Sequence, residues 1–344
     1  MTDAFQGLAG QERAVEALRA ALEQPVPSYL FTGPAGGGMR ATAIAFAAEL
    51  LAQGSQDPER IRRLVLAEQH PDLILFERFG ASLSVEQARD IVRTSTTSPY
   101  ECPKKIIFVE DVHLALGSAP MILKVLEEPP ASTHFILTAG QVPSELATIA
   151  SRCVQVEFDL ISPNQLLEIL VASGLDRDNA STIVTAANGS IDRATLLASD
   201  EAALERWNAW QELPRVLDGS GNSASRAVEK MTAMIDAAAT PLIARHDREL
   251  EDLDERAERF GERGIGRRSL EDRHKRELRR LRTDELLMGT TALGMAVGDA
   301  IRQGVIDPNS GTESLESVTR AAKDLSRNGN EKLLLQRLFM NLKT

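Results

Sequence analysis

The stretch Gly33-Pro34-Ala35-Gly36-Gly37-Gly38-Met39-Arg40 decides the fold of this chain. It follows an apolar run at residues 29–32 and precedes residues 41–52, whose alanine-rich pattern predicts a helix. A strand, a glycine turn and a helix in this order are typical of a phosphate-binding loop, whose pattern is G-x-x-x-x-G-K-[ST]. The stretch therefore predicts a phosphate-loop fold at the start of the chain.

The residues that carry the chemistry of such a loop are replaced here. Gly33 and Gly38 have the required spacing and Gly36 lies between them, but Met39 occupies the lysine position and Arg40 the Ser/Thr position. A thioether cannot offset phosphate charge, and a guanidinium cannot ligate Mg²⁺. In a protein that binds nothing, the glycines would still form the turn between strand and helix. We expect a vestigial, inactive phosphate loop.

A second motif matches the strand that carries the acids of such folds. The apolar residues 106–109 are followed by Glu110 and Asp111. Ligands of parallel α/β sheets bind at the carboxyl ends of the strands, where these acids are expected. The alternative is an ordinary strand that ends in two solvated acids. Together with the glycine loop, the pattern favours a Walker B-like strand.

Strands alternate with helices up to residue 160 and then stop. Apolar runs predict strands at 72–76, 135–138 and 154–158, and Ser84-x-x-Gln87 predicts a capping box at the start of a helix over 85–93. This alternation predicts an α/β fold with a parallel sheet and helices on both faces. Residues 161–200 are expected to form three or four short helices, and the rest of the chain is also expected to be helical.

A dense mixed-charge stretch covers residues 245–282 and is interrupted by Gly261, Gly264 and Gly266. Its second part, residues 269–288, predicts a long exposed helix with closely spaced acids and bases. The stretch is either a solvated surface or an arm that contacts DNA or a partner protein.

The composition is that of an ordinary globular protein. Hydrophobic residues make up 43% and charged residues 26% of the chain, and the net charge is −11. This charge argues against a broad nucleic-acid footprint, because each phosphate contact needs a cation. The two cysteines do not suggest a disulfide framework. With no signal-peptide pattern and no apolar run near 18 residues, we expect a cytoplasmic protein without a membrane segment.

Taken together, the motifs resemble one family: the clamp-loader subunits of bacterial DNA polymerase III, which are AAA+ proteins. The resemblance covers about residues 5–205. It rests on the glycine loop, on residues 106–111, on Leu123-Lys124-Val125-Leu126-Glu127-Glu128-Pro129-Pro130 followed by Phe135-Ile136-Leu137, and on Ser151-Arg152-Cys153. It implies an AAA+ domain over residues 1–160, a helical lid domain over 161–205 and a helical collar domain over 206–344.

Within that family, the degenerate loop resembles the delta-prime type more than gamma/tau, which keeps its Lys-Thr pair and hydrolyses ATP. The resemblance implies that Arg152, flanked by Ser151 and Cys153, acts as an arginine finger on ATP bound by a neighbouring subunit. Taken without the family, Arg152 is more simply a salt-bridged arginine beside the sheet.

Several positions depart from the pattern of ATP-hydrolysing members. Glu110-Asp111 reverses the usual order of the two acids, and Ala139 or Gly140 replaces the residue that senses the γ-phosphate. In the lid, Asp192 stands where a second sensing arginine is expected. We therefore expect no nucleotide turnover by this chain.

We also expect no metal site. Many family members bind zinc through four cysteines after the first helix, but residues 52–70 contain no cysteine. The histidines show no metal-ligand spacing; they are His70, His113, His134, His246 and His274.

The resemblance thus implies a non-hydrolysing clamp-loader subunit. Its partners would be gamma/tau and delta subunits, with ATP and magnesium held by the neighbours and the sliding clamp and primed DNA reached through the complex. One alternative is an active gamma/tau-like ATPase. A second is a stand-alone DNA-binding module built on residues 245–282.

Overall fold

The computed structural model describes residues 3–6, 8, 10–76, 83–115, 117–140, 142, 144–260, 267–325 and 329–343. Its contacts divide the chain into two compact units, residues 1–199 and 200–344. The helix α10 (Glu201–Gln211) opens the second unit. The finer division at residues 160 and 205 stays a prediction.

The first unit is built on a five-stranded parallel sheet. The strands are β1 (Ser28–Thr32), β2 (Leu73–Phe76), β3 (Lys105–Val109), β4 (Thr133–Ala139) and β5 (Val154–Glu157), in the order β2-β3-β4-β1-β5. Each strand was predicted within three residues, and the parallel arrangement is confirmed. The sheet brings the ends of β1, β3 and β4 side by side.

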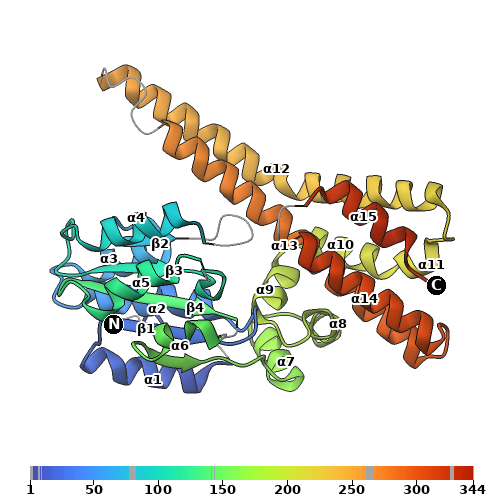
Figure 1. Ribbon diagram of the computed structural model, residues 1–344, viewed down its shortest axis with the longest axis horizontal. Helices are drawn as coiled ribbons and strands as arrows, with labels where there is room; N and C mark the ends of the chain where they lie inside the picture. The colour runs from blue at the N-terminus through green and yellow to red at the C-terminus, as the bar shows by residue number, and fades with distance from the viewer. Residues whose placement is uncertain are drawn as a thin grey trace. The chain divides into compact units, whose positions relative to one another are not determined.

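Helices cover both faces of this sheet, as the alternating pattern predicted (Figure 1). Residues of α1 (Glu12–Glu23), α2 (Met39–Ala52) and α3 (Pro58–Leu66) share one buried cluster with strand residues such as Phe31 and Phe108. Residues of α4 (Val85–Ser95), α5 (Ala119–Glu127) and α6 (Ala147–Ala150) share a second cluster with Leu30 and Ile107. Successive strand residues point to opposite faces, so neighbours in sequence enter different clusters.

The ends of α4 are both satisfied by side chains. The predicted capping box is present at its start: Ser84 accepts from the Gln87 backbone N–H, and the Gln87 side chain accepts from the Ser84 N–H. At its end, the buried Lys105 of β3 donates to the carbonyl oxygens of Thr94 and Thr97. A lysine is tolerated in this core because its ammonium donates to carbonyl oxygens at and just beyond the end of α4.

Three helices follow the sheet within the first unit: α7 (Pro163–Ala172), α8 (Arg177–Ala187) and α9 (Ile191–Ser199). Ser162 caps α7 and Asp176 caps α8. Asn188 ends α8 in a left-handed conformation, and Gly189 follows with φ +79°. This turn places the first residues of α9 against the glycine loop.

The second unit is helical throughout its described residues. Its further helices are α11 (Leu213–Val216), α12 (Gly221–Phe260), α13 (Arg267–Arg302), α14 (Pro308–Leu325) and α15 (Glu331–Met340). Its core contains both tryptophans of the chain, Trp207 and Trp210, and a buried ion pair between Arg206 and Glu285 at 2.7 Å. Among the described helices of either unit, none is long and apolar enough for a membrane crossing.

The described parts of the charged stretch, residues 245–260 and 267–282, belong to α12 and α13, which run side by side (Figure 1). The rings of His246 and His274 stack at 3.9 Å, and each donates to a glutamate of the other helix, Glu277 at 2.8 Å and Glu249 at 2.9 Å. The predicted helix over 269–288 is confirmed as part of α13. The interrupting residues Gly261, Gly264 and Gly266 lie outside the described residues.

Candidate functional site

The glycine loop joins β1 to α2 in the predicted place, and the start of α9 covers it. Gly36 and Gly38 have φ of +89° and +78°, a region that favours glycine. A Cβ at Gly36 would lie 2.1 Å from the Ser190 hydroxyl oxygen, and the Ile191 N–H donates to the Gly36 carbonyl at 3.0 Å. In this conformation the loop contacts the chain's own helix.

The two substituted loop residues form the first turn of α2. Met39 packs against the core cluster that contains α1 to α3. The Arg40 guanidinium pairs with Glu110 and, at 2.7 Å, with Glu68, and it lies 5.8 Å from the centre of the Phe108 ring. A positive charge supplied by the chain itself therefore lies beside the first acid of the Walker B-like strand.

The second acid is held at the carboxyl end of β3. Asp111 has φ +52°, and its N–H donates to the Thr138 hydroxyl of β4 at 3.1 Å. Next to it, the Gly140 N–H donates to His113 Nδ1 at 3.3 Å. Sequence reasoning missed both Thr138 and His113. Thr138 reaches Asp111 only through the β3–β4 pairing, whereas His113 lies two residues after Asp111 and was considered only as a metal ligand.

Arg152 follows the short helix α6 and is partly exposed, with 35% of its side chain accessible. Its Nη1 donates to the Thr148 carbonyl at 2.8 Å and to the Ser151 hydroxyl at 3.2 Å, and its Nη2 pairs with Glu127 at 2.7 Å. Cys153 packs against the cluster that contains α4 to α6, and burial raises the pKa of its thiol to about 12. Cys153 is thus a packing residue, whereas Ser151 and Arg152 are exposed.

A further cation, Arg193, lies in the first turn of α9. Asp192, at the expected sensing position, is exposed. The neighbouring Arg193 donates to the Ala187 carbonyl at 3.3 Å, and burial lowers the pKa of its guanidinium. This hydrogen bond joins α9 to the end of α8.

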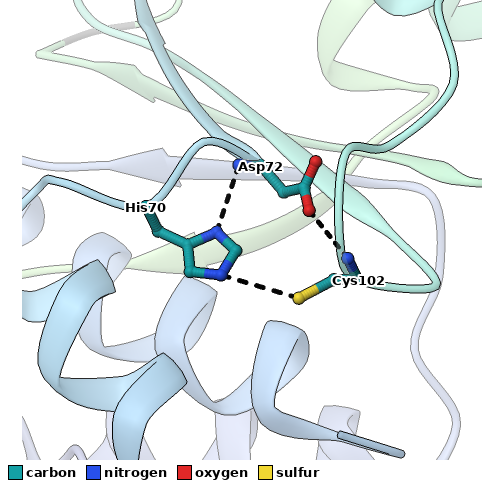
Figure 2. A group of neighbouring side chains, drawn as sticks. All are labelled: His70, Asp72 and Cys102. Carbon is teal, nitrogen blue, oxygen red and sulfur yellow. Dashed lines mark hydrogen bonds between the residues drawn. The ribbon is translucent and has the colours of Figure 1, made fainter.

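The structure also brings together residues that sequence analysis treated separately. His70, Asp72 and Cys102 place possible metal-ligand atoms within 4.8 Å of one another (Figure 2). The Asp72 carboxylate accepts from the backbone N–H groups of Tyr100, Glu101 and Cys102. Burial raises the pKa of the Cys102 thiol to about 11 and lowers the pKa of His70.

The hydrogen bonds of His70 argue against a metal in this cluster. The Asp72 N–H donates to His70 Nδ1 at 3.1 Å, so the neutral ring carries its proton on Nε2. That nitrogen lies 2.9 Å from Glu101 Oε1 and 3.7 Å from Cys102 Sγ. A metal-bound histidine normally donates its other ring N–H, whereas here the other nitrogen is an acceptor. The cluster instead fastens the segment that precedes β3 to the start of β2.

Comparison with known proteins shows similarity to subunits of DNA polymerase III over part of the chain. Residues 10–162 match a family described as DNA polymerase III, delta subunit. A delta' subunit of DNA polymerase III from Pseudomonas aeruginosa is 35% identical over 140 residues, covering 38% of this chain and 43% of the relative. A gamma subunit from Buchnera aphidicola is 29% identical over 63% of each chain. The matches thus span less than two thirds of these relatives.

A solved structure with the same fold covers nearly all of the chain. The gamma subunit-related DNA polymerase III protein of Thermotoga maritima aligns with 95% of this chain and 97% of its own, with a TM-score of 0.52 and 14% identity. The predicted architecture of a parallel α/β sheet followed by helices is confirmed. Over its sheet the chain is similar to the family described as DNA polymerase III, delta subunit, and over nearly its whole length it shares the fold of the Thermotoga maritima protein.

Proposed function

We propose that this chain is a delta-prime-type clamp-loader subunit that hydrolyses no ATP itself and supplies Arg152 to ATP bound by a neighbouring gamma/tau subunit. It would act in the cytoplasm with gamma/tau and delta subunits, which together load the sliding clamp onto primed DNA. ATP and magnesium would be held by the neighbours. The observation that carries the proposal is the contrast between an exposed Arg152 and a glycine loop in which Met39 replaces the lysine and Arg40 replaces the Mg²⁺-ligating Ser/Thr.

The chemistry of the two arginines supports this division. Arg40 is in the first turn of α2 and pairs with Glu110 and Glu68, so its charge is balanced within the chain. Arg152 stands at the end of a helix with part of its planar donor set exposed. An arginine that reaches a γ-phosphate stabilises charge that develops as the phosphoryl group is transferred.

The test is Arg152→Ala in a complex reconstituted with gamma/tau and delta subunits, the clamp and primed DNA. Removing an arginine finger costs about 10³-fold or more at one site in related phosphoryl-transfer enzymes. We expect the rate of clamp loading to fall by at least about tenfold, because other sites in the complex keep their own fingers. The control is Arg177→Ala, which removes an exposed arginine from α8. Clamp loading at the wild-type rate by the Arg152→Ala complex would contradict the proposal.

The active-ATPase alternative is tested separately on the isolated chain. We expect no Mg²⁺-dependent ATP binding at millimolar nucleotide by calorimetry, because neither Met39 nor Arg40 provides the required chemistry. Saturable binding that EDTA abolishes would favour a gamma/tau-like ATPase instead.

The DNA-binding alternative draws less support from the structure. Several charges of residues 245–282 are used between α12 and α13, including Arg267 with Asp254 at 2.6 Å and Arg245 with Glu277. A steep salt dependence of DNA binding by the isolated chain would favour this alternative.

A further inference from the structure

We propose that Glu127 is a positioning residue for Arg152: its carboxylate holds the guanidinium in the orientation in which a neighbour's phosphate meets it. The inference rests on the proposed function of Arg152 and assigns a role to a second residue of the same surface. It is carried by the ion pair between Arg152 Nη2 and Glu127 Oε1 at 2.7 Å.

The backbone around Glu127 is well fixed. Glu127 is the last residue of α5, and the two preceding residues, Val125 and Leu126, are buried. Beyond it, the Thr133 N–H donates to the Pro130 carbonyl at 2.8 Å in the turn that leads into β4. Proline also restricts the backbone of the turn itself. The carboxylate therefore extends from a rigid base.

Arg152 starts from an equally rigid place. Ile149 and Ala150 of α6 share a buried cluster with Val125 and Leu126 of α5, so the two helix ends are packed together. The Arg152 N–H donates to the Ile149 carbonyl at 3.0 Å, which continues the helical turn. The distance between the two side-chain bases is thus set by core packing.

Only some of the N–H donors of the Arg152 guanidinium are used by its contacts within the chain. Nη1 donates to the Thr148 carbonyl and the Ser151 hydroxyl, and Nη2 pairs with Glu127. An arginine has five N–H donors. These contacts leave the Nε–H and one Nη2–H without a partner among the residues that the structure describes, and those donors can receive an anionic ligand.

Stability alone is a weak reason for this ion pair. Its side chains are 35% and 45% exposed, and exposed pairs contribute about 0–1 kcal/mol. Its larger effect is on the freedom of Arg152, a long side chain that would otherwise sample many rotamers. Holding the side chain beforehand lowers the entropy lost when phosphate is bound and keeps the reacting groups aligned.

The test uses the reconstituted complex and a matched pair of variants, Glu127→Gln and Glu128→Gln. Glu128 is the next residue, is exposed, and makes no contact with Arg152 among the interactions described. We expect Glu127→Gln to lower the kcat of the complex for ATP hydrolysis about three- to tenfold. The KM for ATP and the melting temperature of the variant chain should stay unchanged. Glu128→Gln should retain wild-type kcat, and Glu127→Asp should restore part of it.

The double variant separates positioning from an independent effect. If Glu127 acts through Arg152, Glu127→Gln adds nothing to Arg152→Ala. If the double variant instead loses kcat by the product of the two single-variant factors, the inference is overturned. A wild-type kcat in Glu127→Gln while Arg152→Ala is impaired would also overturn it, and the proposed function would then stand. No effect of Arg152→Ala would overturn the proposed function and, with it, this inference.

A second measurement does not depend on assembly or activity. In the isolated chain, nuclear magnetic resonance of the arginine side chains reports rotation of each guanidinium about its Nε–Cζ bond. We expect slow rotation for Arg152 in the wild type and in Glu128→Gln, and faster rotation in Glu127→Gln. Equal rotation rates in all three proteins would overturn the inference.

Discussion

Arg40 shows how one substituted residue changes the charge of a phosphate-loop-like turn. An active loop has a Ser/Thr hydroxyl there that ligates Mg²⁺, with a Walker B acid nearby. In this chain the guanidinium of Arg40 pairs with Glu110, so the acid that would face a metal faces a covalently attached cation. Glu68 adds a second acid at 2.7 Å. The charge of Arg40 is therefore paired with two acids of the chain itself.

This pairing predicts a stability effect of Arg40→Met, which keeps most of the unbranched stem of the side chain but removes the charged guanidinium. The pair is partly buried, with 25% of the Arg40 and 14% of the Glu110 side chain exposed. We expect a loss of about 1–2 kcal/mol in the free energy of unfolding, measured by urea denaturation, because Glu110 is left near the core without its partner.

The double variant Arg40→Met/Glu110→Gln is the control for this loss. It should recover most of the stability, because the partly buried carboxylate of Glu110 is removed and Glu68, which also loses Arg40, is exposed to solvent. Losses that simply add in the double variant would show that the two residues act separately.

At the scale of elements, the close contact between α10 and α13 depends on one glycine. A Cβ at Gly289 of α13 would lie 2.1 Å from the ring of Trp210 in α10. Gly298 lies on the same helix, where the nearest atom to an added Cβ is the flexible end of Arg302 at 3.6 Å. The same substitution therefore has opposite consequences at the two positions.

We expect Gly289→Ala to destabilise the second unit by about 1–3 kcal/mol through overpacking against Trp210. Gly298→Ala should instead raise stability by up to about 1 kcal/mol, because alanine is the better helix former. Tryptophan fluorescence during urea unfolding measures both effects, since the two tryptophans of the chain lie in this unit. A wild-type midpoint for Gly289→Ala would mean that α10 and α13 pack less closely than described.

At the scale of the whole molecule, stability depends on pH through histidines held neutral in the first unit. Burial lowers the pKa of His70 and of His134 below the ordinary value of 6.5. His134 Nδ1 donates to the Val26 carbonyl at 2.9 Å, which fixes its tautomer. Below pH 6.5 the unfolded chain takes up protons that the folded chain does not, so acid favours unfolding.

We therefore expect the free energy of unfolding to be lower at pH 5.5 than at pH 7.5, as measured by urea denaturation followed by circular dichroism. His134→Asn, whose amide N–H can replace the Nδ1–H, should show a smaller difference between the two pH values. The same difference in wild type and variant would exclude His134 as a source of the acid sensitivity.

The helices, strands and turns of the first unit could be predicted from local sequence patterns, because each pattern has a local cause. The glycine loop, the Walker B-like acids and the Ser84–Gln87 capping box were each placed correctly, since turn, strand and cap preferences act within a few residues. The chain order of strands and helices further implied a parallel sheet. The identity of Met39 and Arg40 was enough to predict lost phosphate chemistry, a prediction that awaits its binding test.

Only the tertiary structure decided what these residues touch. The Arg40–Glu110 pair spans 70 positions in the chain and forms because β3 and α2 meet at one edge of the sheet. The packing of α6 on α5 brings Arg152 to Glu127, and the turn before α9 brings Ser190 to Gly36. Such contacts depend on strand order and helix packing, which no local pattern encodes. The sequence by itself predicted the resemblance to clamp-loader subunits and the altered loop, while the fold determined which charges meet.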